Sequence, residues 1–213
     1  SDTRQTEQFR HLYHPPSIDG DFTGKHIITV EQFARADLES LFATTQSLRD
    51  RVAAKDRELA QLATGRVMAS LFFEASTRTD MSFQAAMRRL GGEVIMASNG
   101  VQFSSVYKGE NLADTVRAAG CYADVLALRH PSVGSSYEAA YYLDRLNERI
   151  VTPTSVISGG DGAGEHPTQG LLDLFTIIDL KGGLDNLTIT LVGDLLYGRT
   201  VHSLAKLVAL YEA

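Results

Sequence analysis

A run of hydroxyl side chains around one arginine is the first feature of this sequence that could do chemistry. Ser76, Thr77, Arg78 and Thr79 follow an apolar run and directly precede a helical pattern of apolar residues. The sequence therefore predicts a strand-to-helix turn with these residues at the helix N-terminus. Free backbone N–H groups and the helix dipole favour an anion there, and the side chains add donors for phosphate oxygens. Ser and Thr also cap helices, but four donors in a row exceed what a cap needs, so we expect phosphate binding.

Four further polar side chains occupy positions where a ligand could be held. Arg129 ends an apolar run typical of a buried strand, and ligands of open α/β sheets bind at the carboxyl ends of the strands. His166 begins a predicted helix after a glycine-dense segment, and Gln169 follows in its first turn. Position alone leaves a capping or surface role as open as ligand contact for these two residues. Arg199 also begins a helix, where the dipole disfavours a cation unless an anionic partner is bound.

Strand and helix patterns alternate along the chain and predict the elements that carry these residues. Such alternation indicates βαβ units, so we expect an α/β fold with a doubly wound, mostly parallel sheet and helices on both faces. The expected strands lie near Val67–Phe73, Glu93–Ala97, Asp124–Leu128, Val151–Ile157 and Leu187–Val192. The expected helices lie near residues 36–63, 81–90, 112–122, 136–146, 167–180 and 199–211.

The pattern predicts a division of the chain near residue 158. Residues 1–157 form the first predicted domain, which begins with an irregular, partly ordered arm over residues 1–25. The glycine-dense segment Ser158–Gly164 predicts a loop at the junction, either a flexible surface loop or the lining of a site. Residues 158–213 hold one predicted strand and two helices, which are too few to close a second doubly wound domain. We therefore expect the second domain to be incomplete.

The composition argues against several classes of function. The 213 residues carry a formal net charge of −6, which argues against nucleic acid as a partner. No apolar run reaches the roughly 18 residues of a membrane span, so no membrane partner is expected. The six histidines lack paired metal-ligand spacing, and no Walker-type glycine loop occurs, so neither a metal nor a cofactor is expected. The single Cys121 is expected to be a small buried side chain, which fits a reducing, cytoplasmic compartment.

Five short motifs resemble those of aspartate carbamoyltransferases and follow one another in that family's order. Phe73–Thr79 resembles the carbamoyl-phosphate motif, and the similarity runs from about Thr29 to the last residue. Related ornithine enzymes share Ser-Thr-Arg-Thr, but they differ before it and have a late His-Cys-Leu-Pro segment that this sequence lacks. The other four motifs are Lys108–Glu110, Arg129–Pro131, His166–Gln169 and Val192–Ser203.

The resemblance implies transfer of a carbamoyl group from carbamoyl phosphate to L-aspartate, a step of pyrimidine biosynthesis. Residues 1–157 would be the carbamoyl-phosphate-binding domain and residues 158–213 the start of an aspartate-binding domain. Arg78 would contact the phosphate and the leaving oxygen. Thr79, Arg129 and His166 would donate to the carbamoyl oxygen as it gains charge. The remaining implied substrate contacts are Ser76, Thr77, Gln169, Arg199 and Thr200, with Glu74 orienting the arginines.

The resemblance also implies an active site that is shared between chains. In the family, the loop that corresponds to the segment with Ser104 and Lys108 reaches into a neighbouring subunit and contacts the bound phosphate compound. A homotrimer would then be the smallest catalytic unit, and a larger pyrimidine-pathway assembly is compatible with it. By itself, a loop lysine is usually just solvated.

Two residues depart from the family pattern, and the short second domain leaves alternatives open. Asp80 stands where many relatives carry a basic residue, and Leu196 where several carry lysine. Either difference would weaken substrate affinity without abolishing chemistry. A non-catalytic subunit for carbamoyl-phosphate binding or assembly is one alternative, and a carbamoyltransferase for another amine acceptor is the second.

Overall fold

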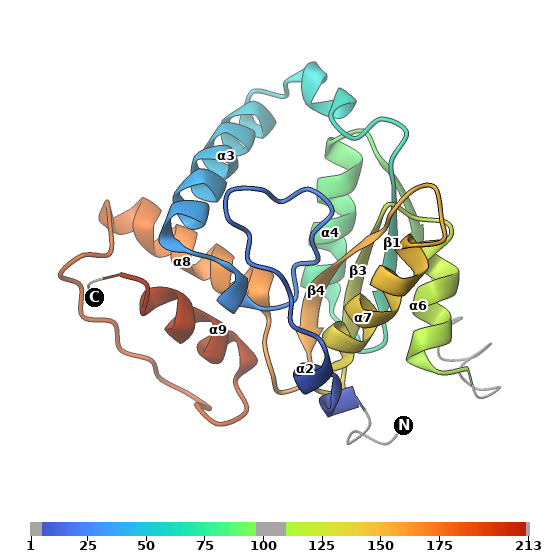
Figure 1. The fold of residues 1–213 in the computed structure, drawn as a ribbon. Coiled ribbons are helices and arrows are strands. Elements are labelled where there is room, and N and C mark those ends of the chain that lie inside the picture. The colour runs from blue at the N-terminus through green and yellow to red at the C-terminus, as the bar shows by residue number, and fades with distance from the viewer. Residues whose placement is uncertain (1–5, 97–109, 212–213) are drawn as a thin grey trace.

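A four-stranded parallel sheet forms the centre of the computed structural model, which describes residues 6–96 and 110–211 (Figure 1). The strand order is β2–β1–β3–β4. Because β2 and β3 lie on opposite sides of β1, the winding direction reverses between β1 and β3, and such a switch point is where doubly wound sheets bind ligands. The strands are β1 (Val67–Phe72), β2 (Glu93–Met96), β3 (Val125–His130) and β4 (Ser155–Asp161).

Helices cover both faces of this sheet, as the alternating pattern predicts. On one face, Ala69 and Leu71 of β1 pack in a core with α6 and α7. On the other face, Met68 of β1 packs with Met87 of α4. Successive strand residues point to opposite faces, so one apolar strand serves two cores. These three helices are α4 (Thr77–Arg89), α6 (Leu112–Gly120) and α7 (Ser135–Asn147).

A third core joins the two ends of the described chain. Leu174 of α8 and Leu207 of α9 pack with Val30 of η1 and Leu38 of α3, and all four side chains are buried. An ion pair between Arg49 and Asp179 also links α3 to α8 at 2.8 Å. These helices lie together beside the sheet in Figure 1. The remaining elements are α2 (Phe9–Leu12), η1 (Val30–Gln32), α3 (Arg35–Ala53), η2 (Arg57–Gln61), α8 (Pro167–Lys181) and α9 (Arg199–Val208).

The strand expected over residues 187–192 is wrong for the described part of the chain. Leu187 and Ile189 pack against the third core, whereas Val192 is 88% exposed, and no strand is formed. Alternating apolar residues predict a strand, but a strand also needs neighbours for its backbone N–H and C=O groups. Among the described residues the sheet consists of β2, β1, β3 and β4, and none of these strands pairs with residues 187–192.

The loop expected over residues 158–164 is wrong in its first half, since β4 continues through Asp161. The glycines serve close packing. A Cβ at Gly159 would lie 3.3 Å from the Phe72 ring, and one at Gly160 would lie 3.4 Å from the guanidinium groups of Arg129 and Arg199. The expected strand start at Val151 moves to Ser155. The domain division near residue 158 remains a prediction.

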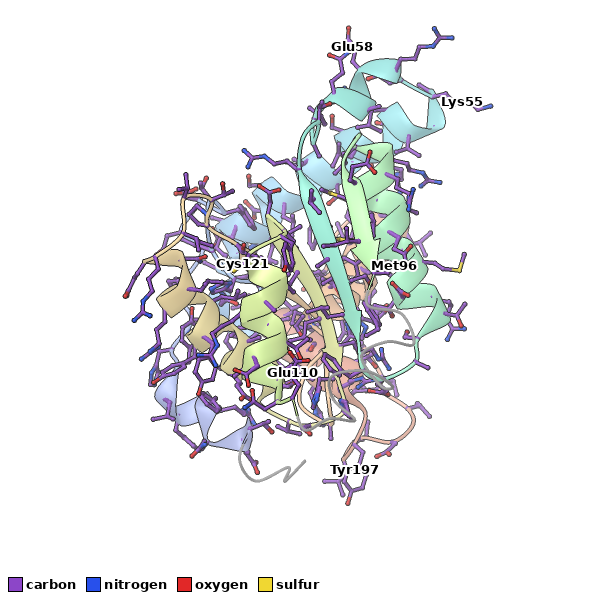
Figure 2. All side chains as sticks on the ribbon, turned by 90° about the vertical axis from the view of Figure 1, so that its right-hand side faces the viewer. Lys55, Glu58, Met96, Glu110, Cys121 and Tyr197 are labelled. Atoms are coloured by element: carbon purple, nitrogen blue, oxygen red, sulfur yellow. The ribbon has the colours of Figure 1, made fainter. Side chains whose placement is uncertain are left out.

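Two smaller expectations are also corrected. The helix expected over residues 36–63 ends at Ala53, because Lys55 takes a left-handed φ of 54°, and η2 follows. Cys121 is exposed rather than buried (Figure 2). The buried side of α6 carries Leu112 and Val116 at a spacing of four, and Cys121 falls off this face just after the helix ends.

Candidate active site

The predicted strand-to-helix turn lies at the carboxyl end of β1, beside the end of β3. Ser76 is the N-cap residue of α4, but its side chain makes no capping hydrogen bond. The Ser76 hydroxyl is therefore not used in the way that an ordinary cap would use it. The first turn of α4 carries Thr77, Arg78 and Thr79, and its backbone N–H groups face the switch point of the sheet.

A cavity of about 900 Å³ opens at this turn and brings together residues from distant parts of the chain. Residues from both predicted domains line this cavity. Thr77 is exposed and is not part of the lining, and Ser104 and Lys108 lie outside the described residues. The predicted site residues that line the cavity are Ser76, Arg78, Thr79, Arg129, His166, Gln169, Arg199 and Thr200.

Glu74 connects two arginines of this cavity, the buried Arg129 and the partly buried Arg199. Its carboxylate accepts from Arg129 Nη2 at 3.1 Å and from Arg199 Nη1 and Nη2 at 3.1 and 3.2 Å. Burial raises the pKa of Glu74, but the hydrogen bonds from Arg199 and Arg129 outweigh it, so the pKa lies below its ordinary value. Glu74 is thus ionised at neutral pH and holds both guanidinium groups at the cavity wall.

Arg129 has hydrogen-bonding capacity left over. The residue is 8% exposed, and its Nη1 makes a long hydrogen bond of 3.4 Å to the Gly159 carbonyl oxygen. Its Nε is the buried side-chain nitrogen that finds no partner among the described residues. An unpaired buried donor costs about 1–3 kcal/mol, more when it is charged. A ligand oxygen in the cavity would remove this cost.

The electrostatics of His166 suit a neutral hydrogen-bond donor. Burial, and then the positive charges of Arg129 and Arg199, lower the pKa of His166 to about 4. At neutral pH its imidazole carries one N–H and one acceptor nitrogen. Its Nδ1 lies 3.4 Å from the Thr168 hydroxyl. The neighbouring Gln169 donates its amide nitrogen to Asp173 at 2.8 Å, which leaves the amide oxygen as its acceptor toward a ligand.

Sequence reasoning missed part of the cavity lining. Ser82, Phe83 and Ala86 extend the wall from Thr79 along α4, and Thr168, Leu172 and Asp173 extend it along α8. Residues three and four apart share a helix face, so the spacing from Thr79 and from Gln169 could have identified most of them.

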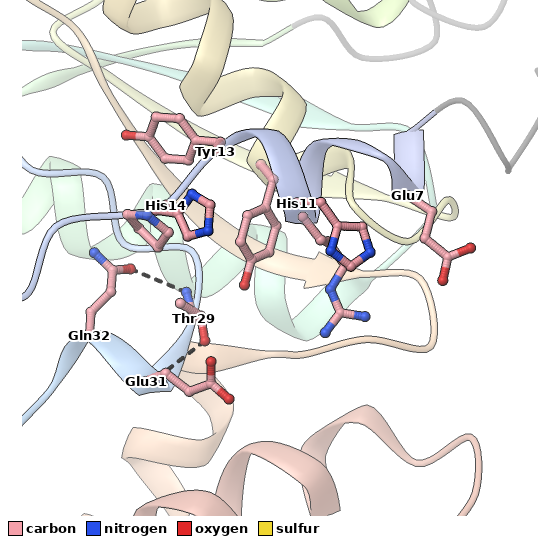
Figure 3. A pocket seen from close by; sticks show the side chains of 10 residues that line it. Glu7, His11, Tyr13, His14, Thr29, Glu31 and Gln32 are labelled. Carbon is pink, nitrogen blue, oxygen red and sulfur yellow. Dashed lines mark hydrogen bonds between the residues drawn. The ribbon is translucent and has the colours of Figure 1, made fainter.

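A second cavity of about 470 Å³ lies away from this site, between the amino-terminal arm and η1 (Figure 3). Hydrogen bonds join three of its lining residues, Thr29, Glu31 and Gln32. Gln32 Oε1 accepts from Thr29 N at 3.2 Å, and Thr29 Oγ1 accepts from Glu31 N at 3.2 Å. Over residues 6–96 and 110–211, no three or more His, Cys, Asp or Glu side chains are grouped to hold a metal ion, and no helix is long and apolar enough to cross a membrane.

Comparison with known proteins places the chain among carbamoyltransferases. Residues 25–179 match the family described as aspartate/ornithine carbamoyltransferase, carbamoyl-P binding domain. The aspartate carbamoyltransferase catalytic subunit of Methanothrix thermoacetophila is 45% identical over 189 residues, which cover 89% of this chain and 58% of that protein. The multifunctional protein CAD of Squalus acanthias is 48% identical over 201 residues, which cover 94% of this chain and 8% of that protein.

Solved structures give the same result. The aspartate transcarbamoylase of Trypanosoma cruzi in complex with carbamoyl phosphate and aspartate superposes with a TM-score of 0.80 at 43% identity. The match covers 93% of this chain and 57% of that one. The chain therefore spans less than two thirds of the length of the relatives that it matches.

Proposed function

The chain belongs to the aspartate/ornithine carbamoyltransferase family, and from this membership we propose that it acts as an aspartate carbamoyltransferase. The reaction would transfer the carbamoyl group of carbamoyl phosphate to L-aspartate and yield N-carbamoyl-L-aspartate and phosphate, as in pyrimidine biosynthesis. The observation that carries the proposal is the unpaired, buried Nε of Arg129 in a cavity that also holds the phosphate-type turn and a neutral His166.

The phosphate group would bind at the N-terminus of α4. Ser76 and Thr79 offer hydroxyl donors, the backbone N–H groups of the first turn point the same way, and Arg78 adds a bidentate partner. Since Arg78 is exposed and makes no ion pair with the described residues, its guanidinium is free for the anion. Arg78 would also contact the oxygen that bridges the carbamoyl carbon and the phosphorus, and so stabilise the departing phosphate.

The carbamoyl group would lie toward Arg129 and His166. The aspartate amine attacks the carbamoyl carbon, a C–N bond forms, and the carbonyl oxygen becomes negative in the tetrahedral intermediate. Arg129, His166 and Thr79 donate to that oxygen, which is worth most in a water-excluded site. The C–O bond to phosphate then breaks, and the amine proton goes to the leaving phosphate. Gln169 accepts from the carbamoyl amide and orients it.

The aspartate side of the cavity is formed by Arg199 and Thr200. Arg199 is held by Glu74 and by the Gly162 carbonyl oxygen at 2.9 Å, so it is preorganised for a carboxylate. Two substrate carboxylates call for further cations, and Leu196 adds none. The relatives extend well beyond the matched length, and further cations would come from segments that correspond to this additional length.

The experiment that tests this function also distinguishes it from two alternative functions. A non-catalytic subunit would bind carbamoyl phosphate without turnover, and a transferase for another amine would use a different acceptor. The position of Arg199 in the same cavity as His166 favours the aspartate enzyme.

We further propose a cytoplasmic homotrimer with shared active sites, in which Ser104 and Lys108 serve a neighbouring chain. The match to relatives named as multifunctional proteins supports a place within a larger pyrimidine-pathway assembly.

The decisive experiment measures N-carbamoyl-aspartate formation from labelled carbamoyl phosphate, with aspartate, ornithine and other amines as acceptors. We expect product with aspartate from a protein that contains this chain and a complete second domain. Turnover with ornithine alone, or carbamoyl-phosphate binding without any product, would establish one of the alternatives.

A further inference from the structure

Asp80 is an acidic residue next to the proposed phosphate-binding turn, and the proposed reaction gives it no function. Asp80 lies in the first turn of α4, one residue after Thr79. At 3.6 residues per turn, Asp80 projects from the helix about 200° away from Arg78. Accordingly, Arg78 and Thr79 line the active-site cavity and Asp80 does not. Its carboxylate therefore faces away from the anion site.

The carboxylate of Asp80 is bound from the sheet. Ser70 Oγ donates to Asp80 Oδ1 at 2.7 Å, and Gln84 Nε2 donates to the same oxygen at 2.8 Å. Ser70 is 4% exposed and lies inside β1, paired with Met96 on one side and Ala127 on the other. The link from Ser70 to Asp80 thus joins the strand that ends at the site to the helix that begins there.

The start of α4 lacks the usual means of fixation. Its N-cap residue Ser76 makes no side-chain capping bond, which leaves the Ser76 hydroxyl for the ligand. A helix start without a cap frays unless another contact holds it. The bond to Ser70 is such a contact, one turn into the helix and on the face opposite Arg78.

We propose that Asp80 is a positioning residue that, through Ser70, holds the first turn of α4 against β1 and so sets the groups that receive the phosphate. The inference rests on the proposed phosphate site at Ser76–Thr79. It also accounts for a carboxylate beside a dianion site, because both donors and the positive end of the helix dipole stabilise the charge on the far side of the helix.

The hydrogen bonds of Asp80 allow the tether and the charge to be tested separately. Both bonds end on Oδ1, so Asp80→Asn keeps both acceptor contacts and removes the charge. Ser70→Ala removes the tether and keeps the charge. Gln84→Ala is the matched control, because it removes one bond to the same oxygen without touching β1. The first readout is the Kd of inorganic phosphate, measured by calorimetry at fixed ionic strength.

We expect Ser70→Ala to weaken phosphate binding about three- to tenfold, since binding must then order the turn. Asp80→Asn should bind phosphate equally well or up to about threefold more tightly, because repulsion is removed. Gln84→Ala should stay within about twofold of the unchanged chain. A Kd in Ser70→Ala that equals the Kd of Gln84→Ala would overturn the proposal.

Amide hydrogen exchange without ligand separates this proposal from the proposed function. Ser70→Ala should speed exchange at Asp80 and the next helix amides, and Gln84→Ala should not. If Ser70→Ala fails to fold, Asp80→Ala at the partly exposed helix position makes the same comparison. A chain that binds no phosphate would refute the proposed function, whereas unchanged exchange in Ser70→Ala or Asp80→Ala would refute the tether.

Discussion

Replacement of Arg78 by alanine should weaken ligand binding and leave the fold intact. The side chain is exposed, lines the cavity and makes no ion pair with the described residues. Its loss should therefore change the free energy of unfolding by no more than about 0.5 kcal/mol. A bound phosphate would lose a bidentate, charge-assisted partner that is worth about 1.5–3 kcal/mol, which weakens binding roughly 10- to 150-fold.

The expected melting temperatures follow from mass action. Ligand at 100 times its Kd stabilises the folded state by about 2.7 kcal/mol, or roughly 5–11 °C for a chain of this length. If the same concentration only equals the Kd of Arg78→Ala, the gain falls to about 0.4 kcal/mol, or roughly 1–2 °C. The assay is thermal unfolding with and without carbamoyl phosphate.

Arg88→Ala provides the matched control, because it removes the same charge from the same helix at an exposed position outside the cavity. Arg88→Ala should keep the full ligand-induced shift. An equal shift in Arg78→Ala and Arg88→Ala would show that the anion does not bind at the start of α4.

The remaining predictions concern pH, subunit sharing and turnover. Between pH 6.5 and pH 4 the unfolded state binds a proton at His166, whereas the folded state, in which the pKa of His166 is about 4, does not, so the free energy of unfolding falls as pH falls. In urea titrations, His166→Gln should remove up to about 3 kcal/mol of this loss. An unchanged dependence of stability on pH would place the titration at another group, for example His130. In a protein with a complete second domain, mixing Lys108→Ala chains with Arg78→Ala chains should restore part of the activity, and no recovery despite proven subunit exchange would contradict shared sites. Residues 1–213 alone should form N-carbamoyl-aspartate poorly, because Arg199 is the one cation that we propose for the two substrate carboxylates, and turnover equal to that of a protein with a complete second domain would disprove this reasoning.

The elements of the fold could be predicted from local patterns, but several contacts of the site could not. The sheet strands around Val67, Glu93 and Val125 follow from apolar runs with turns at their ends, and Arg129 follows because strand ends meet at one edge. The link from Glu74 to two arginines joins residues more than 50 positions apart, which no local pattern specifies.

The failed predictions have physical causes of the same kind. Glycines at 159 and 160 resemble a loop in the sequence, yet they belong to a strand because rings and guanidinium groups pack against them. Alternation over residues 187–192 predicts a strand, yet partner strands decide whether one forms. Tyr197, just beyond this segment, is 68% exposed and projects from the surface in Figure 2. Contacts between residues that are distant in sequence thus determine whether a local pattern forms the strand or loop that it predicts.

The third core has a consequence for how the site forms during folding. Val30 and Leu38 meet Leu174 and Leu207 across 136 to 177 positions of chain, so this core closes only after a very long loop has closed. Contacts of such high sequence separation slow folding and tend to form late. The helix that His166 begins is anchored in that core, whereas the turn at Ser76 depends on nearby strands. Pulse-labelled hydrogen exchange should therefore find the turn at Ser76 protected first and α8 last, so that during synthesis the proposed anion site would form before His166, the residue proposed to act on the carbamoyl group, is in place.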